Sequence, residues 1–191
     1  MRYYWMSINN DIVNSVAFAP KGTHPSHYLI DEVKRKKSLP FSLELHRVGV
    51  SSELIVKDIC DDFYDYQPNS LAWPIMSNKM KSVIEGHLTG KEYIEWKTVT
   101  IKGKDISREY FIPVFTKKLD TLLVEKTVIV KQSGIILKPC FDKNKIKGLS
   151  MFHGHNNFWS ITTQIYVSDA VKRAIKASGI QEIMFSPVHI E

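Results

Sequence analysis

Two segments, 75–99 and 166–191, share one pattern, and this pattern limits the folds that the chain can adopt. Each segment runs from an apolar residue into Ser-Asn or Ser-Asp, then through a short amphipathic stretch into an apolar stretch that carries an aromatic residue. A serine at such a position can cap a helix, because its side-chain oxygen accepts a hydrogen bond from a free backbone N–H of the first turn. The pattern therefore predicts two capped helices, each followed by a strand.

The spacing of the apolar residues supports two helices. Ser77 and Ser168 are the expected caps, and Gly179 is placed to end the second helix. The predicted apolar stripes are Met80, Val83, Ile84 and Leu88 in the first helix and Val171, Ala174 and Ile175 in the second. The stretches that follow, EYIEWKTVTI and EIMFSPVHI, have strand character. A strand–helix–strand unit is thus predicted twice.

The rest of the chain is rich in strand patterns. Strands are predicted for RYYWMSI, SLELHRVGV, SELIVKDI, REYFIPVFT, TLLVEKTVIVK, IILKPCF and NNFWSITTQIYV, and one further helix for SHYLIDEVKRKK. In REYFIPVFT, Tyr110, Ile112 and Val114 alternate with Phe111 and Phe115. The predicted fold class is α+β, a mainly antiparallel sheet with a few short helices and a duplicated strand–helix–strand unit.

The domain prediction is one compact domain over residues 1–191. Within it, two lobes, 1–73 and 74–191, are expected to share one core. The second lobe contains both strand–helix–strand units.

The charge is unevenly distributed along the chain. Residues 1–95 carry 11 Lys and Arg and 12 Asp and Glu, a net charge of −1, whereas residues 96–191 carry 15 and 8, a net charge of +7. A basic half can steer a protein to nucleic acid or to an acidic protein, or it can be a solvated lysine-rich surface. Its lysines stand singly, without the interleaved aromatic residues on which bases stack, so nucleic acid is the less favoured partner.

The sequence predicts a cytoplasmic protein without a membrane span. No apolar run approaches the roughly 20 residues that a spanning helix needs, and the start, MRYYWMSINN, lacks the apolar region of a signal peptide. Cys60 and Cys140 are far apart and form no CxxC motif, so they are expected to be reduced structural thiols without a metal or redox role.

No motif for catalysis or cofactor binding is evident. The chain has no Gly-rich phosphate loop, no GxSxG and no HExxH, so neither catalytic residues nor a cofactor or metal site are predicted, and the chain is not expected to be an enzyme. One alternative stays open: His153 and His155 would share one face of a strand, and with distant carboxylates they could hold a metal or form the site of an enzyme. The Gly-Asn-Asn run around them is equally typical of a turn.

The segment DDFYDY interleaves carboxylates with aromatic rings. Such a segment can imitate nucleic acid and fill the basic groove of a nuclease, with tyrosine as an interface anchor. It can also be an acidic loop that packs Phe63 and Tyr66 into the core. The candidate partner-binding residues are Asp61, Asp62, Tyr64, Asp65 and Tyr66.

Five stretches together resemble a known family. RYYWMS, PIMSNKMKSVIE, EYFIPVFTKKLD, IYVSDAVKRAIKASGI and MFSPV are similar to motifs of bacterial polymorphic-toxin immunity proteins, namely the immunity family numbered eleven. The resemblance implies a small cytosolic protein that binds and neutralises a cognate toxin domain encoded nearby, with no catalytic residue, and it leaves a homodimer open. The alternative is a basic nucleic-acid-associated binding protein without catalytic activity.

Overall fold

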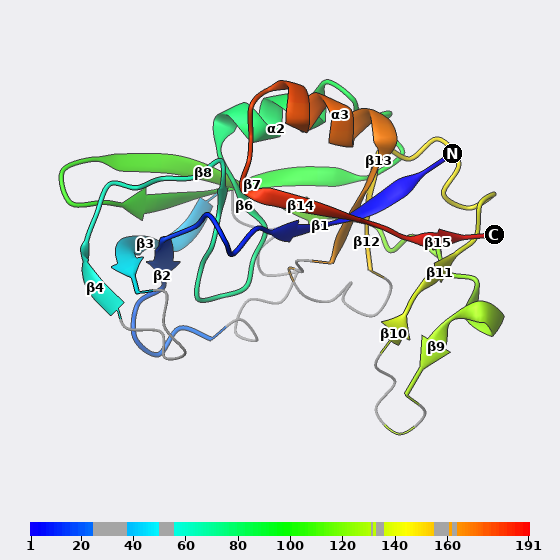
Figure 1. Ribbon diagram of the computed structural model, residues 1–191, viewed down its shortest axis with the longest axis horizontal. Helices are drawn as coiled ribbons and strands as arrows, with labels where there is room; N and C mark the ends of the chain where they lie inside the picture. The colour runs from blue at the N-terminus through cyan, green and yellow to red at the C-terminus, as the bar shows by residue number, and fades with distance from the viewer. Residues whose placement is uncertain (25–37, 50–55, 131, 133–135, 155–160, 162–163) are drawn as a thin grey trace.

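The computed structural model describes residues 1–24, 38–49, 56–130, 132, 136–154, 161 and 164–191. Within them the fold is α+β and mostly antiparallel, which confirms the predicted class (Figure 1). Two larger sheets, two small two-stranded sheets and two helices are present in this part of the chain.

The largest sheet contains seven strands. Their order is β2 (Ser15–Phe18), β3 (Ser38–Val48), β7 (Ile94–Lys102), β8 (Ser107–Phe115), β6 (Ile75–Met76) and β5 (Tyr66–Gln67), and β4 (Val56–Ile59) pairs with β3. β3 and β7 are parallel, and the other neighbours are antiparallel. β7 and β8 form a long hairpin that runs from the pair Ile94–Phe115 to the pair Lys102–Ser107.

The second sheet has four antiparallel strands. Their order is β12 (Met151–His153), β13 (Ile165–Ser168), β1 (Tyr3–Ile8) and β14 (Ile183–Pro187). Of the small sheets, one pairs β9 (Val128–Ile129) with β10 (Ile136–Lys138) and the other pairs β11 (Cys140–Phe141) with β15 (His189–Ile190). Strands from both sides of residue 73 pair in each larger sheet, so the segments 1–73 and 74–191 share sheets.

The two helices begin where the sequence predicts. The N–H of Met80 donates to Ser77 Oγ at the start of α2 (Asn78–Glu85), and the N–H of Val171 donates to Ser168 Oγ at the start of α3 (Asp169–Ala177). Gly179 follows α3 with a φ of +78°, a conformation that costs glycine little. Both predicted caps are therefore confirmed.

Each helix connects two parallel strands that flank an antiparallel one. α2 joins β6 to β7, and both of these strands pair antiparallel with β8. α3 joins β13 to β14, and both pair antiparallel with β1. The two connections have the same topology, while the duplication of the unit stays a prediction.

Both helices pack side by side against a shared apolar cluster, here the helix-side core (Figure 1). Its members include Met6, Tyr66, Met76, Met80, Ile84, Phe115, Ile165, Val171, Ile175 and Ile183. A second cluster, the far-side core, includes Leu43, Leu45, Trp73, Ile75, Val99, Ile101, Tyr110, Ile112 and Val114. The alternation predicted in β8 thus places Tyr110, Ile112 and Val114 in the far-side core and Phe115 in the helix-side core.

One strand prediction is wrong. In TLLVEKTVIVK, residues Val124–Lys126 form a 3-10 turn and only Val128–Ile129 form a strand. Apolar residues occur on both faces of this pattern, so it defines no face to bury, and Val124 is 58% exposed.

Several predicted elements lie wholly or partly outside the described residues. These are the helix SHYLIDEVKRKK, the first half of SELIVKDI, the turn before IILKPCF and most of NNFWSITT. Among the described residues, no helix has the length and apolar character to span a membrane.

We expect the helix-side core to dominate stability. Ile84 of α2 is fully buried, so Ile84→Ala should lower the free energy of unfolding by about 2–5 kcal/mol through lost packing and a cavity. Chemical denaturation followed by circular dichroism measures this. Lys176→Ala, on the exposed side of α3, is the control and should change stability by less than about 0.5 kcal/mol. Equal effects of the two substitutions would contradict the assignment of this core.

We also expect stability to fall at alkaline pH. Burial raises the pKa of Tyr3 and of Tyr166 to about 12, and it raises the pKa of Tyr66 and Tyr110 further. The unfolded chain releases these protons near pH 10 while the folded chain keeps them, so the contribution is complete below about pH 10 and is lost towards pH 12. Denaturation at a series of pH values tests this. Tyr166→Phe should make the decline less steep, and an unchanged slope would count against it.

Candidate functional site

The acidic segment, Asp61–Tyr66, leads from β4 into β5, and hydrogen bonds fix one of its carboxylates to a neighbouring turn and another to β3. Asp61 accepts from the N–H groups of Asp105 and Ile106, in the turn between β7 and β8, at 3.2 and 3.4 Å. Asp62 accepts from Arg47 at 2.7 Å (Nη2) and 3.2 Å (Nε). These two carboxylates therefore serve the framework of the segment.

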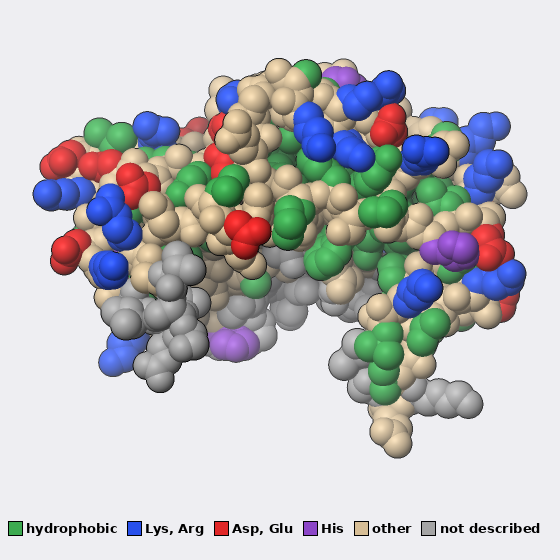
Figure 2. All heavy atoms as spheres, viewed as in Figure 1, with side chains coloured by type: hydrophobic (Ala, Val, Ile, Leu, Met, Phe, Trp, Pro, Cys, Tyr) green, Lys and Arg blue, Asp and Glu red, His purple; other side chains and the backbone are tan. Residues whose placement is uncertain are grey.

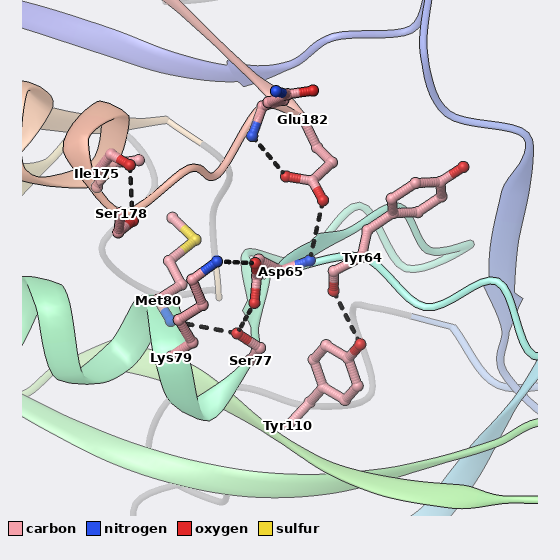
Figure 3. Close-up of polar contacts among 10 residues, drawn as sticks. Tyr64, Asp65, Ser77, Lys79, Met80, Tyr110, Ile175, Ser178 and Glu182 are labelled. Carbon is pink, nitrogen blue, oxygen red and sulfur yellow. Dashed lines mark hydrogen bonds and ion pairs between the residues drawn. The ribbon is translucent and has the colours of Figure 1, made fainter.

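Asp65 joins three parts of the chain (Figure 3). Ser77 Oγ and Lys79 Nζ both donate to its carboxylate, the lysine at 3.2 Å. The N–H of Ser77 donates to its carbonyl at 2.8 Å, and its own N–H donates to Glu182 Oε1 at 3.4 Å. Asp65 thereby links the acidic segment to the cap of α2 and to the residue before β14.

The two tyrosines of the segment differ in position. Tyr64 is half-buried, and its hydroxyl donates to Asn14 Oδ1 at 2.8 Å. Its carbonyl accepts from the hydroxyl of Tyr110 at 2.8 Å (Figure 3). Tyr66 is 2% exposed, because β5 turns its ring into the helix-side core. Tyr66 is therefore a core residue, and the prediction that its side chain contacts a partner is wrong, because the ring is buried.

A groove of about 460 Å³ opens beside the acidic segment. Ten of the described residues line it: Phe63, Tyr64, Asp65, Ser77, Asn78, Lys79, Arg108, Glu109, Tyr110 and Glu182. The guanidinium carbon of Arg108 lies 4.6 Å from the centre of the Phe63 ring, a cation–π contact. We call this feature the groove. Asp61 and Asp62 do not line it, while Tyr64 and Asp65 do.

The groove presents charged side chains and aromatic rings. Three carboxylates (Asp65, Glu109, Glu182) and two cations (Lys79, Arg108) line it, which gives it a small excess of negative charge on a chain with a formal charge of +6. The described residues that line it include neither histidine nor cysteine, so no general base of the histidine type faces it. Its chemistry is that of charged and hydrogen-bonded recognition.

The alternative metal site at the histidine pair is only partly described. His153 ends β12 and is 1% exposed, with its Nδ1 at 2.7 Å from the carbonyl oxygen of Gly154 and its ring packed on Phe115 at 4.8 Å. His155 lies outside the described residues. The structure thus gives His153 a buried position at the end of the edge strand β12.

The sequence alone predicts the part of this groove formed by the acidic segment, but not the residues that face it. Lys79, Arg108 and Glu182 come from α2, β8 and the residue before β14, and no local pattern connects them with the acidic segment. Of the residues that face the acidic segment, only Ser77 was recognisable from the sequence, as the cap of α2.

Asp65 should contribute measurably to stability. Asp65→Ala removes the charged acceptor of Ser77 and Lys79, and we expect a loss of about 1.5–3 kcal/mol in the free energy of unfolding. Glu109→Ala, at an exposed position of the same groove, is the matched control and should change it by less than about 0.5 kcal/mol. Urea denaturation of both variants gives the comparison. If Asp65→Ala were as stable as the control, the linking role of Asp65 would be refuted.

In comparisons with known proteins, no protein-family model matches this chain, and no curated protein matches it.

Proposed function

We propose that this chain is an immunity protein, which binds a cognate bacterial toxin domain encoded nearby and neutralises it by tight non-covalent association. The observation that carries the proposal is the groove, where carboxylates and aromatic rings are held in fixed positions by α2, β8 and the start of β14. The resemblance of five sequence stretches to the immunity family supports it. In this proposal the protein acts in the cytoplasm and not as an enzyme.

The groove is organised before any partner arrives. Asp65 is held by Ser77 and Lys79, and the backbone at Tyr64 is held by Tyr110, so these groups need little reordering on binding. Preorganised groups give affinity because the ordering cost has already been met in folding. Tyrosine and arginine are also the residue types that most often dominate interface energies.

The charge of the groove favours a basic partner surface. Its carboxylates outnumber its cations although the whole chain is basic, so the sign reverses locally. A toxin that cleaves nucleic acid needs a basic groove for its substrate, and an acidic segment beside aromatic rings complements such a groove. The cognate toxin is therefore proposed to present a basic face to this groove.

One observation favours the alternative, a nucleic-acid-associated protein without catalytic activity. Figure 2 shows Lys and Arg side chains gathered over α3, where the sequence places Lys172, Arg173 and Lys176. Two of these cations already have partners, since Arg173 pairs with Asp169 at 3.2 Å and Lys172 lies 3.5 Å from the ring centre of Tyr4. A cation that is already paired contributes less to the binding of phosphate, so we rank this function second.

We expect the tagged protein, isolated from its native host and washed at high salt, to retain one neighbouring gene's product at equal stoichiometry. Tyr64→Ala should weaken affinity for that protein at least about tenfold, because it removes an aromatic side chain that lines the groove. Titration calorimetry measures the affinity, and size-exclusion chromatography shows whether the complex contains a monomer or a homodimer. Tyr93→Ala, an exposed tyrosine that does not line the groove, is the matched control and should bind normally.

Two outcomes would count against the proposal in different ways. If Tyr64→Ala and the surface variant Glu109→Arg both bound the toxin like wild type, the groove would not be the interface. If nucleic acid were recovered instead of a protein, and its affinity for the chain fell steeply with salt, the alternative function would replace immunity.

A further inference from the structure

Three side chains with metal-binding atoms lie together on the small β11–β15 sheet. The two strands are parallel and place Cys140 opposite His189. Glu191 follows His189 at the second position along, which points to the same face because side chains alternate along a strand. The thiol sulfur, a ring nitrogen of the histidine and a carboxylate oxygen all lie within 4.8 Å of one another.

We propose that Cys140, His189 and Glu191 form a binding site for a divalent transition-metal ion, with Zn²⁺ as the best fit. Sulfur, imidazole nitrogen and carboxylate oxygen are the donor types that zinc takes in proteins, and three protein ligands leave a fourth tetrahedral position for water or another ligand. The thiolate disfavours Mg²⁺ and Ca²⁺, which prefer oxygen ligands.

The geometry needs only a small adjustment of exposed groups. His189 Nε2 and Glu191 Oε1 are 2.8 Å apart, whereas two ligands of a tetrahedral zinc ion are separated by about 3.4 Å. Both side chains are exposed and can rotate apart, while Cys140 is 1% exposed and held in β11. The site thus combines one fixed buried ligand with two adjustable ones.

The surroundings of the three ligands supply outer hydrogen bonds and an entry path. Lys126 Nζ donates to Glu191 Oε2 at 2.7 Å, which orients the carboxylate and leaves Oε1 on the side of His189. Such outer partners fix ligand orientation in metal sites. His189 also borders a pocket of about 280 Å³ that opens to solvent beside Pro139 and Val188, so an ion can reach the site. Binding turns the thiol of Cys140 into a thiolate and releases one proton to solvent.

Co²⁺ titration of the untagged chain of 191 residues tests this site, because a cysteine thiolate bound to Co²⁺ gives a charge-transfer band in the near ultraviolet. We expect one equivalent of Co²⁺ to produce this charge-transfer band. Added Zn²⁺ should abolish the band by displacing Co²⁺ from the site. Cys140→Ser should remove the band. His189→Ala and Glu191→Gln change exposed side chains, so they should fold normally and bind Co²⁺ at least about tenfold more weakly.

The chain offers two matched controls. Cys60 is the second free buried cysteine, and His87 is an exposed histidine. Cys60→Ser and His87→Ala should both keep the band and the affinity of the wild-type protein. The proposal is overturned if the wild-type protein gives no thiolate band, if the band survives Cys140→Ser, or if His189→Ala and Glu191→Gln bind Co²⁺ as tightly as wild type. Thermal unfolding with Zn²⁺ adds a second readout, with a higher midpoint expected for wild type and the two controls only.

Discussion

Both faces of the second half of β8, from Ile112 to Phe115, are buried, and this two-sided burial organises the chain around the strand. Ile112 and Val114 face the far-side core, while Phe115 faces the helix-side core. A strand segment without a solvated face needs a covering layer on each side, and α2 and α3 supply one of these layers. Parts of β1 are covered on both faces in the second sheet: Met6 enters the helix-side core, and Tyr3 packs on Phe152 on the other face, at 5.4 Å between ring centres.

The position of the groove follows from this arrangement. β6 and β5 are only two residues long, so the largest sheet ends early beside β8 and the chain crosses its edge as the acidic segment. The start of α2 lies at the same edge, because α2 follows β6 directly. The polar groups that would otherwise be left unpaired there are satisfied by one another, with Asp65 accepting from Ser77 and Lys79. The groove is therefore built from the groups that end a sheet and begin a helix.

Helix caps and strand alternation could be predicted from the sequence, whereas the position of a side chain in the tertiary structure could not. The caps at Ser77 and Ser168 and the alternation in β8 depend on neighbouring residues only, and the structure confirms them. Tyr66 was expected either at a partner surface or in the core, and pattern alone leaves this open because a two-residue strand has no periodicity. The turn at Val124–Lys126 was not predicted. Val124 is exposed there, and a hydrophobic pattern indicates secondary structure only where the apolar residues are buried.

The group formed by Cys140, His189 and Glu191 shows most clearly that contacts between distant parts of the chain cannot be predicted from sequence patterns. Motif spacing tests residues that are close in sequence, whereas Cys140 and His189 meet only because β11 and β15 pair in parallel. β15 continues directly from β14, and Glu182, which accepts from Asp65 in the groove, immediately precedes β14. One continuous stretch of chain thus carries a group of the groove at one end and two proposed metal ligands at the other. Between them, β14 is held by its antiparallel pairing with β1, so both sites depend on the placement of this one strand although they share no side chain.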